Sequence, residues 1–330
     1  MKVFDLHCDT IYRIRKERQA ERECGMRNNN LHIDLKRMKK GGYGLQTFAL
    51  FVDVEEEDSP FWASMELLDI FREEMAANED LIRQVHTYKD LEENESRGLM
   101  SALLSVEDGG VSMGLPDILT EYHKAGVRLM TLTWNYENVF GYPNKVTDHP
   151  SGYMGEPDER GLKEKGIDAL LKMEELGIIP DVSHLSDGGF WDVAKHTKKP
   201  FIASHSNARS VTGHVRNLTD DMILTIAERG GLIGLNFCTA FLREGWQPGS
   251  QPEGGTIEEM LAHLHYLINI GGNDCIALGS DFDGITETPE ISGCEQMNRL
   301  AEAMENNGFT ADQIDKVFYK NVRRFLKENL

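Results

Sequence analysis

The chain has 330 residues, with 35 Lys and Arg against 55 Asp and Glu, so its formal net charge is −20. An acidic chain repels phosphate backbones and anionic lipid headgroups, which argues against a nucleic-acid or membrane-surface binder. Its hydrophobic content of 40 % is ordinary for a globular protein and excludes a disordered or fibrous chain. We therefore expect a partner that is a small molecule.

Two features of the sequence indicate the cellular compartment, namely the five cysteines and the amino-terminal residues. The cysteines, at positions 8, 24, 238, 275 and 294, form no C-x-x-C pair, which favours reduced thiols. No basic segment followed by an apolar stretch opens the chain, and no run reaches the ~18 apolar residues of a membrane span. We expect an unsecreted, cytoplasmic protein without membrane association.

Eight short apolar runs alternate with amphipathic segments, which is the pattern of parallel βαβ units. They cover residues 3–8, 45–54, 101–106, 127–133, 178–183, 201–204, 232–237 and 276–279. Eight such strands with helical connections predict an α/β fold, a single (β/α)8 TIM-type barrel. One metal-dependent hydrolase domain would then cover residues 1–330.

Helix signals in the sequence support the prediction of a barrel. Thr256 and Glu259 form a capping-box pattern ahead of an apolar stripe that stops at Gly271, and Thr310 and Gln313 open a closing helix in the same way. Two polar stretches, residues 138–161 and 243–255, follow the fourth and seventh runs. We expect these loop insertions to lie on the catalytic face and to select the substrate.

Ionisable side chains follow five of the eight runs. Strands of a barrel end on the face that carries the active site, so these side chains should converge there. Buried histidines and carboxylates are costly unless they are paired or bind a metal, which predicts a metal site. The predicted group consists of His7, Asp9, Glu107, His184, His205 and Asp281.

The ligand types indicate which metal and how many ions. Histidines and carboxylates without thiolates suit zinc first, with manganese, cobalt and iron as competitors. One ion needs only three protein ligands and water, so this many groups favour two divalent ions that share a carboxylate. Glu107 is the expected bridge between an ion at His7 and Asp9 and an ion at His184 and His205.

The remaining histidines are expected to be less informative. His263 and His265 lie two positions apart on one predicted helix, so they point about 200° apart, cannot share an ion and are expected at the surface. His149 and His214 fall in loops of the catalytic face and could touch substrate, although solvent exposure is the favoured reading.

Two charged features of the sequence each allow two interpretations. Arg216 follows the His205 loop and could either clamp a substrate carboxylate or form a surface ion pair. The acidic run at residues 55–58 is typical of a solvated loop, but it follows the second strand and could receive a substrate ammonium group.

Seven motifs, in order along nearly the whole chain, resemble the membrane (renal) dipeptidase family of zinc dipeptidases, a branch of the amidohydrolase-type metal barrels. They are D-L-H-C-D-T at 5–10, V-E-D-G-G at 106–110, G-V-R-L-M-T-L-T at 126–133, D-V-S-H-L-S-D at 181–187, A-S-H-S-N-A-R at 203–209, V-R-N-L-T-D-D at 215–221 and G-S-D-F-D-G at 279–284. The resemblance implies that His7 and Asp9 hold one zinc, that His184 and His205 hold the other and that Glu107 bridges them. It also implies that Asp281 transfers protons and that Arg216 holds the substrate carboxylate.

One position departs from that family. Where vertebrate members place a histidine that binds the reacting carbonyl, this chain has Trp134, which donates only an indole N–H. Stabilisation of the oxyanion would then fall to a metal ion, to Asn135 or to His149. The vertebrate lipid-anchor tail is also missing from the sequence, so membrane attachment is not expected.

The sequence thus predicts a binuclear metallodipeptidase, in which a metal-bridging hydroxide attacks the peptide bond and Asp281 carries the proton. Its substrates would be dipeptides, including those with a D residue at the C-terminal position. Another amidohydrolase chemistry, on N-acyl-amino acids or of deaminase type, remains the alternative, because a fold does not fix a substrate. A non-catalytic metal-bearing barrel is the weaker alternative, and the sequence leaves a homodimer open.

Overall fold

A computed structural model describes residues 1–144, 155–247 and 249–330. In this part of the chain the strands have between three and nine residues, and most of these residues are buried. In chain order they are β1 (Val3–Asp5), β2 (Tyr43–Phe51), β3 (Ile82–Gln84), β4 (Met100–Glu107), β5 (Val127–Thr131), β6 (Ile179–Asp181), β7 (Ile233–Leu235) and β8 (Ile276–Leu278).

The strands form one curled, parallel sheet with the order β6-β5-β4-β2-β1-β8-β7. Between its two ends, Ile202 forms a parallel bridge with Asp181 of β6, and Ala203 forms one with Ile233 of β7. The backbone of residues 202–203 therefore joins the two ends of the sheet. This confirms the α/β class and is consistent with a TIM-like barrel.

The strand prediction was wrong in two places. The expected strand at 201–204 contributes only the two single bridges, because a short segment after Pro200 is too brief for a ladder. The pattern of apolar runs also gave no indication of β3, which pairs with the first residues of β4, whereas β5 joins β4 from Leu104 onward. Its three residues, Ile-Arg-Gln, carry no alternating pattern that could have predicted a strand.

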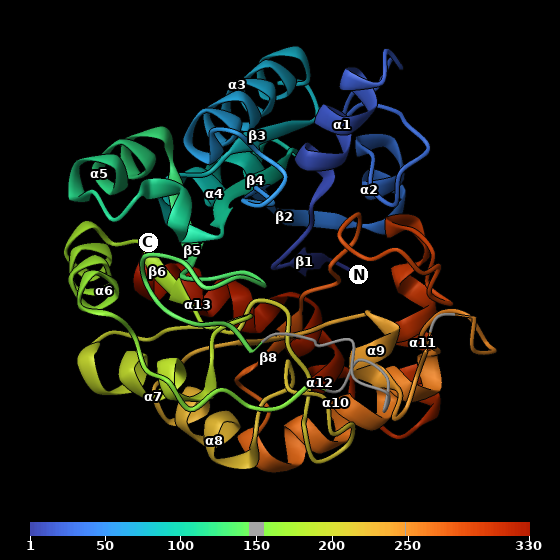
Figure 1. Cartoon of the computed structure of the whole chain (residues 1–330). Coiled ribbons are helices and arrows are strands. Elements are labelled where there is room, and N and C mark those ends of the chain that lie inside the picture. The colour runs from blue at the N-terminus through green and yellow to red at the C-terminus, as the bar shows by residue number, and fades with distance from the viewer. Residues whose placement is uncertain (145–154, 248) are drawn as a thin grey trace.

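Helices pack against the sheet, most of them around its outside (Figure 1). Their bounds are α1 (Thr10–Gln19), α2 (Leu35–Gly41), α3 (Pro60–Ala77), α4 (Tyr88–Ser96), α5 (Pro116–Ala125), α6 (Glu164–Leu176), α7 (Asp187–His196), α8 (Asp220–Glu228), α9 (Thr239–Leu242), α10 (Ile257–Gly271), α11 (Met297–Asn306), α12 (Ala311–Asp315) and α13 (Asn321–Asn329). The predicted capping boxes are confirmed at the starts of α10 and α12. A π-helical turn at Lys316–Lys320 links α12 to α13.

Helix α13 packs on the inside of the curled sheet. Its Val322, Phe325 and Leu326 share one buried cluster with Phe4 of β1, Leu103 of β4 and other residues from around the sheet. The carboxyl-terminal helix therefore covers the end of the sheet at which the strands begin, and the opposite end remains for a site.

Both expected loop insertions lie partly outside the described residues, since 145–154 and 248 are not described. Within the described ranges, no helix combines the length and the apolar character that a bilayer span requires.

Candidate active site

Every residue of the predicted metal group lies at the carboxyl end of a strand or just beyond it. Glu107 is the last residue of β4, while the others follow β1, β6, the 202–203 bridge segment and β8. All but one of these residues are buried, and the side chain of Asp281 is 15 % exposed. The structure thus brings six side chains, separated in sequence by up to 274 residues, to one end of the sheet.

Irregular backbone turns several of these side chains inward. Strand β1 ends at Asp5, so regular alternation does not extend to His7 and Asp9. His184 and Asp281 adopt left-handed φ angles of 70° and 61°, which non-glycine residues adopt at a cost of about 1–3 kcal/mol. A Cβ on Gly284 would lie 2.2 Å from Oδ2 of Asp9, so only glycine fits beside the site.

Two buried aspartates, which the sequence analysis did not single out, fix these turns. Oδ1 of Asp5 accepts hydrogen bonds from N of His7 at 3.2 Å and from N of Ser280 at 3.0 Å. Oδ1 of Asp181 accepts from N of Ser183 at 3.0 Å and from N of Ser204 at 2.9 Å. Each aspartate therefore ties together two neighbouring strand ends that carry site residues.

The carboxylate of Glu107 lies between histidines. Its Oε2 is 3.3 Å from Nε2 of His7, and its Oε1 is 3.0 Å from Nε2 of His184 and 3.6 Å from Nε2 of His205. Potential ligand atoms of Glu107, His7 and His205 all lie within 4.8 Å of one another. The two oxygens of Glu107 therefore face histidines on two different sides of the carboxylate.

His184 and His205 point their Nε2 atoms at each other, 2.9 Å apart. Burial lowers the pKa of both imidazoles well below the usual range, and nearby cationic groups lower it further, so both rings are neutral at pH 7. Nδ1 of His205 lies 2.8 Å from Oγ of Ser204, to which it can donate. That tautomer leaves Nε2 of His205 with a lone pair for a metal.

Nδ1 of His184 has two neighbours that require opposite tautomers. Oδ1 of Asn135 lies at 3.0 Å and accepts when Nδ1 is protonated, whereas Nε of Arg216 at 3.1 Å donates when Nδ1 is bare. Only the first tautomer leaves Nε2 free to bind a metal. Asn135 therefore suits a role in orienting His184.

A second cluster combines His7, Asp9 and Asp281, again with ligand atoms within 4.8 Å. Nε2 of His7 lies 3.6 Å from Oδ2 of Asp9 and 3.8 Å from Oδ1 of Asp281. Oδ2 of Asp281 accepts from Nδ2 of Asn236 at 3.0 Å. Burial raises the pKa of Asp281 to about 7, although the neighbouring His7 opposes the shift.

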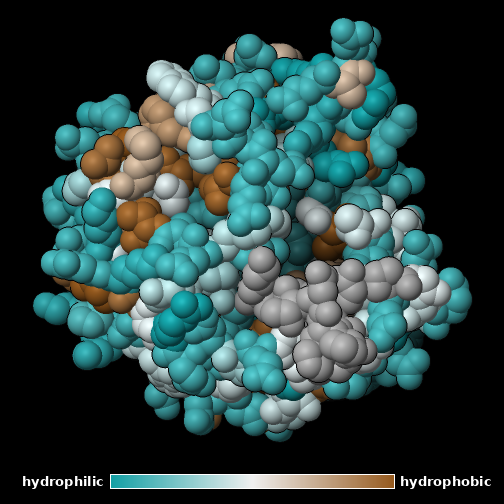
Figure 2. All heavy atoms as spheres, viewed as in Figure 1, coloured by the Kyte–Doolittle hydropathy of each residue, from teal (hydrophilic) through white to brown (hydrophobic). Residues whose placement is uncertain are grey.

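A cavity of about 740 Å³ opens beside these clusters, and its lining includes Asp9, Glu107, His184 and Asp281. In the view of Figure 2 a hollow lies near the centre of the molecule, and the coloured residues above it are mostly hydrophilic. The volume lies within the usual ~300–1,000 Å³ of small-molecule sites.

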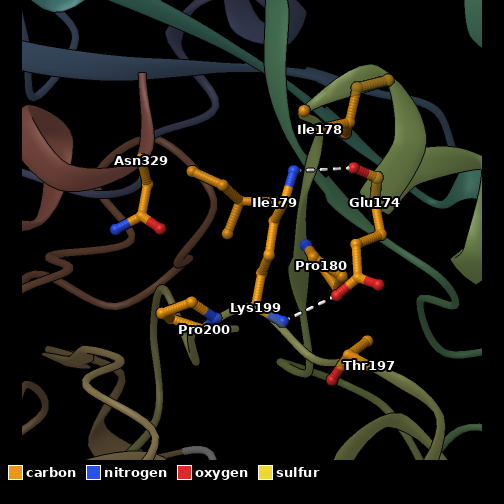
Figure 3. Close-up of a pocket in the computed structure, with 9 residues that line it drawn as sticks. Glu174, Ile178, Ile179, Pro180, Thr197, Lys199, Pro200 and Asn329 are labelled. Carbon is orange, nitrogen blue, oxygen red and sulfur yellow. Dashed lines mark hydrogen bonds between the residues drawn. The ribbon is translucent and has the colours of Figure 1, made fainter.

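A second cavity lies beside β6 and α13, among side chains that include Glu174, Lys199 and Asn329 (Figure 3). Lys199 donates from Nζ to the carbonyl oxygen of Glu174 at 3.0 Å and from its backbone N to Oε1 of Glu174 at 2.7 Å. This cavity holds about 20 Å³, room for about one water molecule. It is therefore too small for a substrate.

The predicted substrate residues fall into three groups. Trp134 and Asn135 line the large cavity, and the Trp134 ring centroid lies 4.7 Å from that of Phe51. Arg216 is buried, and it forms no ion pair with a described carboxylate, so the surface ion-pair reading was wrong. His149 lies outside the described residues.

Two predictions of exposed histidines were also wrong. His214 is fully buried because its loop folds back against α9, and its Nδ1 accepts from N of Arg216 at 3.0 Å. His263 is fully buried because it lies on the face of α10 that carries Met260 and Leu267. That spacing of three and four residues was visible in the sequence. His265 on the same helix is exposed, so the two histidines do point apart.

The acidic run at 55–58 does not reach the cavity. Glu56 forms an ion pair with Lys16, and Glu57 forms one with Arg15. Neither glutamate lines the large cavity. This segment is therefore better described as a solvated loop than as a binding site for a substrate ammonium group.

A parallel α/β sheet with histidines and carboxylates gathered at its carboxyl ends is typical of metal-dependent hydrolases. Residues 1–329 match the family described as membrane dipeptidase (peptidase family M19), and the chain belongs to this family. The protein is a dipeptidase, a hydrolase of a family of metallopeptidases.

Relatives agree with this assignment. An uncharacterised dipeptidase of Schizosaccharomyces pombe is 30 % identical over 99 % of this chain and 80 % of its own length. A metallopeptidase of Rhodobacter sphaeroides, solved with a phosphinate mimic of the dipeptide L-Ala-D-Ala, is 28 % identical and superposes with a TM-score of 0.87 over 100 % of this chain and 99 % of that one. A second solved M19 metallopeptidase, dipeptidase AC, is 28 % identical with a TM-score of 0.86 over 100 % of this chain and 98 % of that one.

Proposed function

We propose that the protein is a two-metal dipeptidase in which Glu107 serves both ions. The observation that carries this proposal is that the two oxygens of Glu107 face histidines on different sides, His7 on one and His184 with His205 on the other. His7 and Asp9 would hold one ion, and His184 and His205 would hold the other. We also propose that the fold is a (β/α)8-type barrel, in which the bridges at Ile202 and Ala203 take the place of a longer strand between β6 and β7.

The donor atoms fit divalent metals. Among the described residues, the buried Nε2 of His7 and Oδ1 of Asp9 have no hydrogen-bond partner, although burying a polar atom without one is costly. The candidate groups contain imidazole and carboxylate and no thiolate. This composition favours zinc, with manganese, cobalt and iron as competitors.

When bound, the divalent ions would lower the pKa of the attacking water and polarise the scissile carbonyl. Asp281 would accept the water proton at Oδ1, which faces His7, and return it to the leaving amine. Asn236 would hold Oδ2 of Asp281 and so keep Oδ1 turned toward the reacting atoms.

Arg216 would bind the free carboxylate of the dipeptide. Its guanidinium is buried, and its Nη2 has no hydrogen-bond partner among the described residues, which is costly until an anion supplies one. The guanidinium carbon lies 5.1 Å from the ring centroid of Phe241, which lines the large cavity. Trp134 and Asn135, which line the same cavity, would form part of the wall around the substrate. Because Asn135 contacts Nδ1 of His184, it would not bind the oxyanion. Stabilisation of the oxyanion would then fall to a metal ion or to His149.

Dipeptides with a D residue at the C-terminal position are the substrates we propose, because the relative from Rhodobacter sphaeroides binds a mimic of L-Ala-D-Ala. The test is a panel of L-Ala-D-Ala, L-Ala-L-Ala, N-acetyl-D-Ala and the amide L-Ala-D-Ala-NH₂ with the metal-loaded protein. We expect fast release of D-Ala from the first substrate and slow turnover of the N-acetyl and amidated compounds. Preferred turnover of N-acetyl-D-Ala would instead favour an N-acyl-amino-acid hydrolase.

We further propose that residues 1–330 form one catalytic domain that works in the cytoplasm. Phe4 of β1 and Phe325 of α13 share one buried cluster, which supports a single domain. The five cysteines are free, which supports a reducing compartment. Fractionation of cells that express the protein would test the location. Light scattering of the purified protein would distinguish a monomer from a homodimer.

A further inference from the structure

A buried carboxylate in the large cavity has no part in the proposed chemistry. Glu287 lies six residues beyond Asp281 in the segment after β8, is 9 % exposed, and lines the cavity. Among the described residues no ion pair includes its carboxylate, and only the backbone N–H groups of Glu287 and Thr286 stabilise its charge. A buried ionised carboxylate without a cation is costly, and such groups are rarely retained without a partner.

Among the described residues, no cationic side chain compensates the charge of Glu287 inside the cavity. Burial raises the pKa of Glu287, and the charge of Glu253 raises it further, while only nearby backbone N–H groups lower it. Arg13, the one cationic residue in the described lining, is exposed. Asp283, another acid of the lining, already accepts from Oγ1 of Thr10 at 2.6 Å and from N of His32 at 2.7 Å.

The cavity also offers apolar surface for a long side chain. Phe51, Trp134, Phe241 and Trp246 line it together with Glu287. Lysine and arginine bury their methylene stems against apolar surface and direct the charged end to a polar partner. An ammonium or guanidinium group that reached Glu287 would supply the missing positive charge, while its stem would pack on these aromatic rings.

We propose that Glu287 selects dipeptides that carry a cationic side chain by forming an ion pair with that side chain inside the cavity. This inference rests on the proposed function, because it assumes that the cavity holds the dipeptide beside the metal group. It adds a substrate class, namely dipeptides that contain lysine or arginine. Glu287 acts in this account as a specificity residue that contacts the substrate away from the scissile bond.

The test compares substrates that differ only in charge. L-Lys-D-Ala is paired with L-norleucyl-D-Ala, and L-Ala-D-Lys is paired with L-Ala-D-norleucine, because norleucine keeps the stem and removes the ammonium group. For each pair kcat/KM is measured with the metal-loaded wild-type protein and with Glu287→Gln. Glu287→Asp keeps the charge on a shorter stem, and Glu258→Gln removes an exposed carboxylate of α10 that does not line the cavity.

We expect wild type to prefer lysine over norleucine by about tenfold or more at one of the two positions, as a charged hydrogen bond of ~1.4 kcal/mol would give. Glu287→Gln should abolish this preference by slowing only the lysine substrate. Glu287→Asp should retain part of it, and Glu258→Gln should retain all of it, which excludes an effect of net charge alone.

Three outcomes would overturn the inference. The first is equal turnover of the lysine and norleucine substrates by wild type. The second is an unchanged lysine preference in Glu287→Gln, and the third is an equal loss on both substrates of a pair, which would mark a structural role. Failure of the proposed function looks different, since the metal-loaded protein would then hydrolyse neither the lysine nor the norleucine dipeptides.

Discussion

Oε1 of Glu107 lies 3.0 Å from Nε2 of His184, at the point where β4 ends. The other oxygen of the same carboxylate faces His7, 3.3 Å away. Glu107 is 2 % exposed, and at these distances its two oxygens contact both histidines directly. A single carboxylate therefore couples the two halves of the proposed metal centre.

Replacing this carboxylate should disturb both ions. Glu107→Gln removes the charge and one oxygen ligand, so we expect metal content to fall on both sides of the site and dipeptide hydrolysis to be lost. Metal analysis of the purified variant after dialysis measures this, with Glu258→Gln as a control for one lost negative charge. Full retention of metal by Glu107→Gln would remove Glu107 from the bridging position.

Asp281→Asn separates proton transfer from metal binding. We expect metal content and thermal stability to stay near those of wild type while kcat falls by ~10²–10⁴, the range for a positioned proton-transfer group. Asn236→Ala, which removes the hydrogen bond to Oδ2, should cost less. Because Asp281 also lies within ligand distance of His7 and Asp9, loss of a metal ion from Asp281→Asn would identify it as a ligand instead.

The proposed ion pair between Arg216 and the substrate carboxylate can be tested by changing either partner. Leaving one charge of a desolvated pair without its partner costs ~2–5 kcal/mol. Arg216→Ala on a free dipeptide and wild type on the amidated dipeptide should therefore each lose ~30-fold or more in kcat/KM. The two changes together should cost much less than their sum, because they disrupt the same contact. Additive losses would mean that Arg216 does not bind this carboxylate.

His263 should make stability depend on pH. Burial lowers the pKa of His263 to about 4, whereas the unfolded chain titrates near 6.5. As pH falls, the unfolded state therefore binds a proton before the folded state does. The contribution of neutral His263 to the free energy of unfolding is complete above pH 6.5 and is lost as pH falls toward 4. The loss should reach about 2 kcal/mol between pH 7 and pH 5.

Urea unfolding at several pH values, for wild type and His263→Asn, measures this contribution. Asparagine keeps an acceptor for the backbone N of Ala208, which donates to Nδ1 of His263 at 3.2 Å, but it cannot titrate. We expect the variant to be less stable at pH 7 and to lose less stability on acidification. An identical pH dependence in both proteins would show that His263 does not contribute.

The sequence predicted the parts of this molecule that depend on local pattern. The apolar runs located β1, β2 and β4 to β8, and the caps at Thr256 and Thr310 located two helix starts, because burial and capping act over a few residues. The predicted metal group is brought together at the strand ends because parallel strands all end on one face. The roles of its members remain predictions.

What the sequence did not predict depends on contacts between distant segments. Asp5 holds Ser280, and Asp181 holds Ser204, through backbone hydrogen bonds that no local motif indicates. His214 is buried only because its loop meets α9. Glu287 was missed for the same reason, since its burial comes from the segments that enclose the cavity rather than from its own neighbours in sequence.

The most direct test of the two-metal account is a zinc titration of protein stripped with a chelator, followed by the rate of L-Ala-D-Ala hydrolysis. The account predicts that activity rises to a plateau at two ions per chain and that renewed chelation abolishes it. A plateau at one ion, or full activity in the stripped protein, would contradict the assignment of Glu107 as the shared ligand of two ions.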